Sequence, residues 1–181
     1  MTSVPGARNI IVSWSLNPQK IVETVEHFTA PLPRRLAAAQ RCVAHGYQVA
    51  FHYDPIIYYP GCESDYEALI DMTFHAVGGG DVAWISLGTL RMTPRLKKIM
   101  ENRFPDNTIL DEEFFTGHDG KLRYPQEVRR SLYKNMTSWI RRHCKGVPIY
   151  LCMEEKSMRF AKPAVYPPEP LISPDLSGVP A

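Results

Sequence analysis

The chain has 181 residues, and its 21 Lys and Arg residues against 19 Asp and Glu residues give a formal net charge of +2. This length suits one domain or a large piece of one, and fractions of 44% hydrophobic and 22% charged residues exclude a chain that is disordered throughout. A charge this close to balance means that any nucleic-acid surface must be local. No apolar run approaches the ~20 residues of a membrane span, so we expect no membrane partner.

The cysteine pattern excludes the common metal loops. Cys42, Cys62, Cys144 and Cys152 lie too far apart for a CxxC or CxxxCxxC motif, so we expect no metal ligands in this chain. Without a signal peptide, we expect free thiols, mostly small buried hydrophobes, in a protein of the reducing cytoplasm.

The first half of the chain predicts strands that alternate with helices. We expect a disordered start over 1–8, strands over 9–15, 47–53 and 81–87, and helices over 19–27, 34–45, 63–77 and 93–103. The connections are long enough for parallel pairing with right-handed crossovers. This pattern predicts an α/β fold, either half of a (β/α) barrel or a small parallel sheet.

The second half changes pattern. Strand-like runs over 108–115 and 121–124 flank His118-Asp119-Gly120, and Asp-Gly between such runs predicts a β-hairpin. A long helix over 125–143 and a last strand over 147–153 follow. We take 9–161 as the folded unit, and the Pro- and Ser-rich segment 162–181 is expected to be a disordered tail.

Polar residues follow each predicted strand, where ligands bind in α/β sheets. Ser13, Ser15 and Asn17 end the first strand, His52, Asp54 and Pro55 the second, and Ser86, Gly88 and Arg91 the third. One rim of this composition suits a polar, zwitterionic small molecule with a ribose. Other readings stay open, because Ser15 and Asn17 could cap a helix, His52 could be a satisfied core histidine, and Asp54 could simply start a turn.

The hairpin is a second candidate site. Lys121 and Arg123 alternate along a strand and share a face, with Tyr124 beside them, so they could contact phosphates and a base. The alternative is a solvated surface hairpin followed by an ordinary charged helix. The acidic run 111–113 is better explained as a solvated or salt-bridging patch than as an acid–base pair.

Several runs resemble the DNA-repair photolyase-like family of radical S-adenosylmethionine (SAM) enzymes that includes spore photoproduct lyase. They are VSWSLNP, RRLAAAQRCVAHGYQVAFHYDPII, SDYEALI, WISLGTLR, GKLRY and YLCMEE, in order over roughly residues 9–160. The resemblance implies a partial (β/α) barrel of the radical SAM type, of which this chain would hold about three βα units, a C-terminal β-hairpin, a long helix and a final strand.

The resemblance also implies an activity and a set of site residues. In the family a 4Fe–4S cluster cleaves SAM to a radical that reverses a thymine photoproduct in DNA, and the protein supplies position and water exclusion. By position, Ser15 and Asn17 would meet SAM, and Asp54 and Pro55 would lie beside the adenosine. Ser86 completes the predicted cofactor rim, and Lys121, Arg123 and Tyr124 would lie beside the DNA lesion.

The chain departs from the family in important ways. The CxxxCxxC loop has no counterpart here, so the cluster is expected only in an N-terminal half, upstream or on a separate chain, and no catalytic residue can be assigned. We expect this chain alone to be inactive as a lyase. Asp54 replaces a small apolar residue of the spore enzyme, which suggests another substrate. The alternatives are a cluster-free nucleic-acid-binding module and an inactive truncated remnant.

Overall fold

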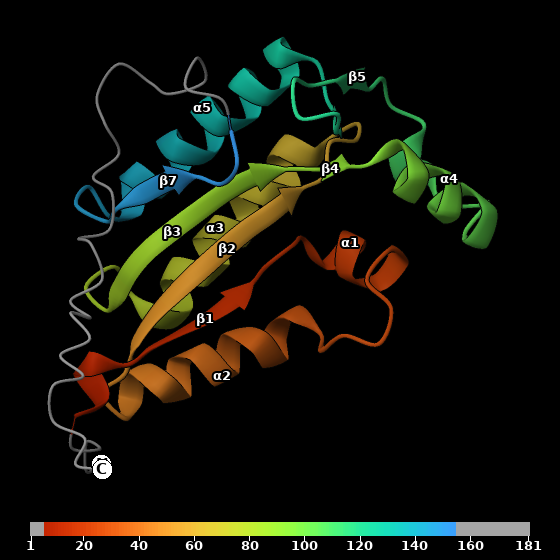
Figure 1. Cartoon of the computed structure of the whole chain (residues 1–181). Helices are drawn as coiled ribbons and strands as arrows, with labels where there is room; N and C mark the ends of the chain where they lie inside the picture. Colours follow the sequence, from red (N-terminus) through yellow and green to blue (C-terminus); the bar gives the residue numbers. More distant parts are fainter. Residues whose placement is uncertain (1–5, 155–181) are drawn as a thin grey trace, which may run out of the picture.

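A four-stranded parallel sheet forms the centre of the computed structural model, which describes residues 6–154 (Figure 1). Its order is β1-β2-β3-β7, and the strands are β1 (Ile11–Ser15), β2 (Gln48–Ile56), β3 (Val82–Thr89) and β7 (Ile149–Leu151). The α/β class, the parallel pairing and the final strand are thus confirmed. The described strands form an open sheet, so the barrel character stays a prediction.

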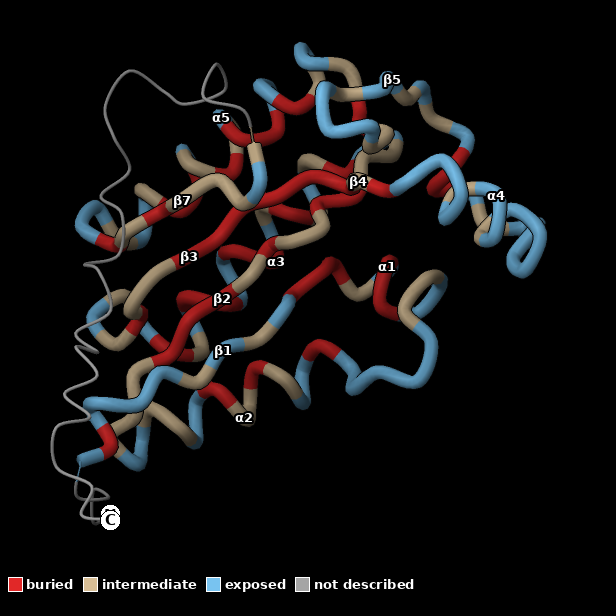
Figure 2. The backbone as a smooth tube through the Cα atoms, in the orientation of Figure 1, coloured by how far each residue is buried: buried red, intermediate tan, exposed pale blue. Residues whose placement is uncertain are grey.

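Three long helices cover one face of this sheet (Figure 1). They are α2 (Leu32–Ala44), α3 (Cys62–Val77) and α5 (Gln126–His143). Each has apolar residues at helical spacing, such as Leu69 and Phe74 on α3, and these pack against alternate strand residues such as Phe51 and Ile85. The resulting core is the red interior of Figure 2. The opposite face of the sheet has no helix over it within residues 6–154.

Shorter elements gather at the carboxyl ends of the strands. They are the helices α1 (Gln19–Thr24) and α4 (Pro94–Arg103), and a small antiparallel sheet in the order β4-β6-β5, made of β4 (Arg91–Met92), β6 (Leu122–Arg123) and β5 (Phe115–Thr116). A second apolar cluster, which includes Ile21, Ile57 and Tyr124, joins these elements. It positions α1 and the hairpin at the same end of the main sheet.

Two predicted elements differ from the structure. The hairpin forms, but only Phe115–Thr116 of its first arm pairs, because Thr108–Leu110 is a 3-10 helix (η2) whose start is capped by the Asn107 side chain. The sequence predicts that strand β2 stops before Asp54, yet it runs to Ile56. Its register with β3 shifts between Tyr53 and Ile56, which accommodates the missing amide of Pro55.

The chain ends fall partly outside the described residues. Ala7–Asn9 forms a 3-10 helix (η1) with Ala7 buried, so the expected disordered start over 1–8 is wrong for Ala7 and Arg8. Residues 1–5 are not described. The predicted tail, 162–181, lies outside the described part of the chain. None of the helices over residues 6–154 is long and apolar enough to cross a bilayer.

Candidate functional site

The uncovered face of the main sheet carries a polar row at mid-height. Pairing aligns one residue from each strand in this row, namely Ser15, His52, Ser86 and Tyr150. The next position toward the carboxyl ends holds Asp54 on β2 and Gly88 on β3. Side chains on one face of neighbouring strands lie close together, so the strand ends that the sequence singled out do converge on one side.

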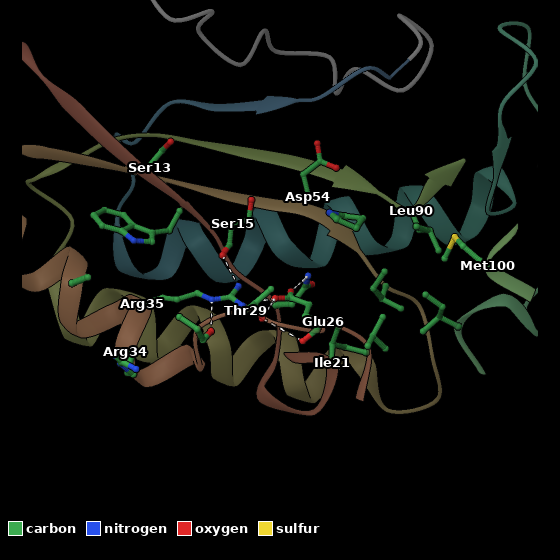
Figure 3. Close-up of a pocket in the computed structure, with 18 of the residues that line it drawn as sticks. Ser13, Ser15, Ile21, Glu26, Thr29, Arg34, Arg35, Asp54, Leu90 and Met100 are labelled. Atoms are coloured by element: carbon green, nitrogen blue, oxygen red, sulfur yellow. Dashed lines mark hydrogen bonds and ion pairs between the residues drawn. The ribbon is translucent and has the colours of Figure 1, made fainter. Parts of the chain in front are cut away.

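A groove of about 890 Å³ runs beside β1 at this end of the sheet (Figure 3). Ser13, Ser15 and Asp54 line it from the sheet, and their oxygens point to the same side in Figure 3. Arg34 and Arg35 line it from α2. The other end of the groove is apolar, with Ile21, Val25, Ile57, Leu90, Met100 and Ile109. A ligand with a polar part and a flat or apolar part would match both ends.

The loop after β1 is fixed by a network of hydrogen bonds in the wall of the groove. Asn17 is buried, its amide donates to Glu26 at 3.0 Å, and its carbonyl oxygen accepts from the Tyr66 hydroxyl at 2.8 Å. Arg35 forms an ion pair with Glu26 and donates to the Ser15 carbonyl oxygen at 3.0 Å. Asn17 is therefore occupied by protein partners, whereas Ser15 offers an exposed side chain to the groove.

Glu26 is ionised because its partners outweigh its burial. Burial alone would raise the pKa of this carboxyl, but hydrogen bonds from Arg35 and Asn17 bring the pKa below its ordinary value. The charge of Glu26 is thus neutralised within the network by Arg35. The polar end of the groove keeps Arg34 and Arg41 as exposed cations on α2, so it favours an anionic or carboxylate-bearing group.

Asp54 is held in a bidentate ion pair. Its two carboxylate oxygens lie 2.9 Å and 3.2 Å from the guanidinium nitrogens of Arg91. Cys152 hydrogen-bonds to Asp54, and burial together with this carboxylate raises the pKa of the thiol. Gly88 makes room for the arrangement, since a Cβ there would stand 2.7 Å from the Asp54 carboxylate. Asp54 and Pro55 line the groove as predicted, but the Asp54 charge is already paired.

Ser86 does not line the groove. It is fully buried, its hydroxyl lies 2.7 Å from Nδ1 of His52, and Tyr150 also hydrogen-bonds to it. Burial lowers the pKa of His52, although Asp54 opposes the shift, so His52 is a half-buried neutral imidazole at neutral pH. The rim therefore brings together Ser15, Asn17, Asp54 and Pro55, while a cofactor contact by Ser86 stays a prediction.

In the hairpin, two of the three side chains that were predicted to contact DNA point into the protein. Arg123 is buried and makes two hydrogen bonds to the Asp119 carboxylate, at 2.6 Å and 2.8 Å. Tyr124 is 1% exposed, stacks on Phe114 with ring centroids 5.0 Å apart, and accepts from the Tyr58 amide. Lys121 keeps a part-exposed side chain. Contacts of these three residues with DNA stay predictions, and Lys121 is the most accessible of them.

Two implied groups fit the chain differently. The groove fits SAM, because it offers a hydroxyl, cations for a carboxylate and an apolar end for a flat ring. An iron–sulfur cluster does not fit, since residues 6–154 hold no group of three metal-ligating side chains and their four cysteines are scattered free thiols.

Sequence reasoning missed the residues that support the site. Glu26 and Tyr66 lie 9 and 49 positions from Asn17 and carried no motif. Arg35 lies in the run RRLAAAQRCVAHGYQVAFHYDPII that resembles the family, but no contact was predicted for it. Glu26 lies nine positions before Arg35, a separation at which no local pattern predicts an ion pair.

Comparisons with known proteins agree with the resemblance. A family model described as "Spore photoproduct lyase" matches residues 7–150. The spore photoproduct lyase of Bacillus subtilis (strain 168) is 27% identical over 136 residues, which are 70% of this chain and 40% of that protein. A solved structure of a spore photoproduct lyase mutant superposes with a TM-score of 0.68 at 26% identity, over 78% of this chain and 44% of that one.

Another solved structure, at 24% identity and a TM-score of 0.68, shares the fold and is of a spore photoproduct lyase mutant with bound AdoMet and dinucleoside spore photoproduct. The chain spans less than half the length of these relatives. The matched segment nevertheless includes the main parallel sheet, the groove beside β1 and the hairpin. On the family match over these residues, the chain belongs to the spore photoproduct lyase family.

Proposed function

We propose that this chain is the SAM-facing and DNA-facing half of a radical SAM enzyme that repairs a lesion in DNA. The observation that carries the proposal is the groove beside β1, which lies within the family match and joins a polar, cationic end to an apolar end. One related structure, of a spore photoproduct lyase mutant, has AdoMet and a dinucleoside lesion bound together. We propose the same two ligand classes for this chain.

Each groove residue has a distinct part in the proposed binding of SAM. Ser15 offers its hydroxyl, and Arg34 and Arg41 offer charge to the amino-acid carboxylate. Asn17 acts by fixing the loop, since both ends of its amide are already bonded. Asp54 and Pro55 bound the middle of the groove, and the apolar end around Leu90 and Met100 takes the flat ring. When bound, SAM supplies the radical chemistry that removes a hydrogen atom from the lesion.

The sheet needs a second part of the fold for this function. Within residues 6–154, β1 pairs only with β2, and one sheet face has no helix over it. A segment that adds strands beside β1 would close the groove on its open side and bring the cluster ligands that residues 6–154 lack. We propose that this segment is a cluster-bearing half, upstream in the same protein or on a separate chain.

Binding and chemistry can be tested separately. We expect calorimetric titration of SAM into the natural full-length gene product, reconstituted anaerobically with iron and sulfide, to show one site. Ser15→Ala should weaken it by about tenfold, a typical cost for a lost hydrogen bond. Ser138→Ala, at an exposed position of α5 that does not line the groove, is the matched control. Cleavage of SAM and repair of a dinucleoside photoproduct should follow. Absence of SAM binding in a reconstituted, folded protein would refute the proposal.

A further inference from the structure

Helix α4 stands out because it buries none of its ten residues, although it projects from the end of the main sheet (Figures 1 and 2). Thr93 caps its start, Pro94 occupies its first turn, and only the half-buried Met100 packs against the second apolar cluster. Its exposed positions include Leu96 and Ile99, at 45% and 39% of full accessibility. A helix with an apolar stripe in solvent indicates a surface that a partner covers.

The charges on this helix identify the chemistry of that partner. The helix has four basic residues and one acidic residue, Glu101, which pairs with Lys97. The basic residues are Arg95, Lys97, Lys98 and Arg103. Arg95, Ile99 and Arg103 are spaced four residues apart and so share one stripe. Neither arginine of this stripe makes an ion pair within the described residues. They lie roughly 12 Å apart along the axis, or three to four base steps of a nucleic-acid strand.

Exposed rings extend the same surface. Phe104 follows α4 and stacks on His27, with ring centroids 5.2 Å apart and planes at 22°. Next to His27, Phe28 is fully exposed at 108%, with a backbone φ of 59° in the left-handed region. Phe28 is thus linked through His27 and Phe104 to the helix that carries Arg95 and Arg103. An exposed ring and cations on one surface match how proteins bind single-stranded nucleic acid, through base stacking and phosphate contacts.

We propose that α4 and the loop after α1 form a DNA-contacting surface distinct from the hairpin. This α4 surface consists of His27, Phe28, Arg95, Ile99, Arg103 and Phe104. It rests on the proposed function, because the occupant is DNA at the rim of the same groove. Met100 lies on α4 and lines the groove, so a strand held on the α4 surface passes directly beside the proposed SAM site. Its role is to hold nucleotides that flank the lesion.

The test measures binding of a fluorescein-labelled, thymine-rich single strand to the natural gene product by anisotropy over a series of salt concentrations. The charge reversal Arg95→Glu/Arg103→Glu should lower affinity at least about tenfold and reduce the slope of log K against log salt by about 1.4, from two lost phosphate contacts. Phe28→Ala should lower affinity about tenfold and leave the slope unchanged, because stacking releases no counterions.

Matched controls separate this idea from general effects. Lys145→Glu reverses an exposed charge in the loop before β7, and Met72→Ala removes an exposed apolar side chain on α3, so both should bind like wild type. Circular dichroism checks that each variant is folded. Wild-type binding that the α4 variants leave intact overturns the α4 surface alone, and a protein partner would then cover the helix. A wild-type protein that binds no DNA also overturns the DNA part of the proposed function.

Discussion

The groove beside β1 and the β5–β6 hairpin each pair a nearly buried arginine with a carboxylate, but the predicted site residues differ in accessibility. In the groove, the Arg35–Glu26 pair forms part of the wall, and the Ser15 side chain is exposed to a ligand. In the hairpin, Arg123 is itself buried against Asp119, and Tyr124 packs into an apolar cluster. In the sequence, both regions were candidate sites because polar residues gather in them. The difference teaches that a polar residue near a strand end can either contact a ligand or stabilise the fold. Whether the side chain is already bonded to another residue of the protein decides between these roles.

In the hairpin, loss of the buried Tyr124 ring should give the largest loss of folding stability. Replacing Tyr124 with alanine should lower the free energy of unfolding by about 3–5 kcal/mol, because a buried ring is lost from the cluster with Phe114. Tyr124→Phe should cost about 1 kcal/mol, the hydrogen bond from Tyr58. Urea denaturation measures both. Phe115→Ala, on an exposed ring, is the control, and a Tyr124→Ala protein as stable as that control would show that the hairpin is not supported from within.

The Arg35–Glu26 ion pair in the groove wall can be tested by removing its cation. Arg35→Ala leaves the Glu26 carboxylate, whose side chain is 19% exposed, without its cation, and should destabilise the fold by about 2–4 kcal/mol. Arg142→Ala removes an ion pair with Glu67 in which both side chains are about half exposed, and should cost about 0–1 kcal/mol. Equal thermal shifts for the two variants would contradict a supporting role for Arg35.

Gly88 tests how closely β2 and β3 are fitted around Asp54. Gly88→Ala puts a methyl group 2.7 Å from the Asp54 carboxylate and should cost about 1–3 kcal/mol by disrupting the pair with Arg91. Gly146→Ala meets nothing within 4 Å and is the matched control. Chemical denaturation of both proteins measures the difference. If Gly88→Ala were tolerated like Gly146→Ala, the Asp54–Arg91 geometry would be adaptable rather than fixed.

The smallest expected effect is a dependence of folding stability on pH that comes from Glu26. The folded pKa of Glu26 lies below its unfolded value near 4.5, so its stabilising effect is complete above that pH and is lost as the pH falls. Between pH 6 and pH 3, the unfolding free energy of wild type should therefore fall more steeply than that of Glu26→Gln. Parallel curves in urea titrations at each pH would show that the Arg35–Glu26 pair does not depend on ionisation.

The sequence predicted the main sheet well because its signals are local. Apolar runs such as the one around Phe51 and glycines that end helices, such as Gly78, define strand and helix positions within a short window. The hairpin was found from Asp119-Gly120, but its first arm was overextended because Thr108–Leu110 has strand-like composition and a 3-10 conformation. Local propensity does not report the capping by Asn107 that decides between them.

The site was predicted only in part, since its partners are distant in sequence. Ser15 and Asp54 followed from the rule that ligands bind at the ends of parallel strands, and both line the groove. Ser86 obeys the same alternation but lies beneath a contact with His52, 34 residues away. The inward turn of Arg123 likewise depends on Gly117, where a Cβ would stand 2.4 Å from the guanidinium. No spacing rule reveals such tertiary pairings.

The side of β1 that has no partner strand within residues 6–154 would impose a fixed register on any strand that joins it. Ser13 and Ser15 alternate with Val12 and Trp14, so a joining strand that slips by one residue would set its apolar side chains against the wrong face. Alternate residues of β1 face β2, as the bond from the Leu16 amide to the His52 carbonyl shows, and the Ser15 carbonyl is already bonded to Arg35. Ile11 and Ser13 are therefore the residues whose backbone groups face a joining strand. A strand that completes the sheet can therefore form only a few backbone hydrogen bonds with β1. If the chain is overproduced without that strand, the open edge favours edge-to-edge association of copies.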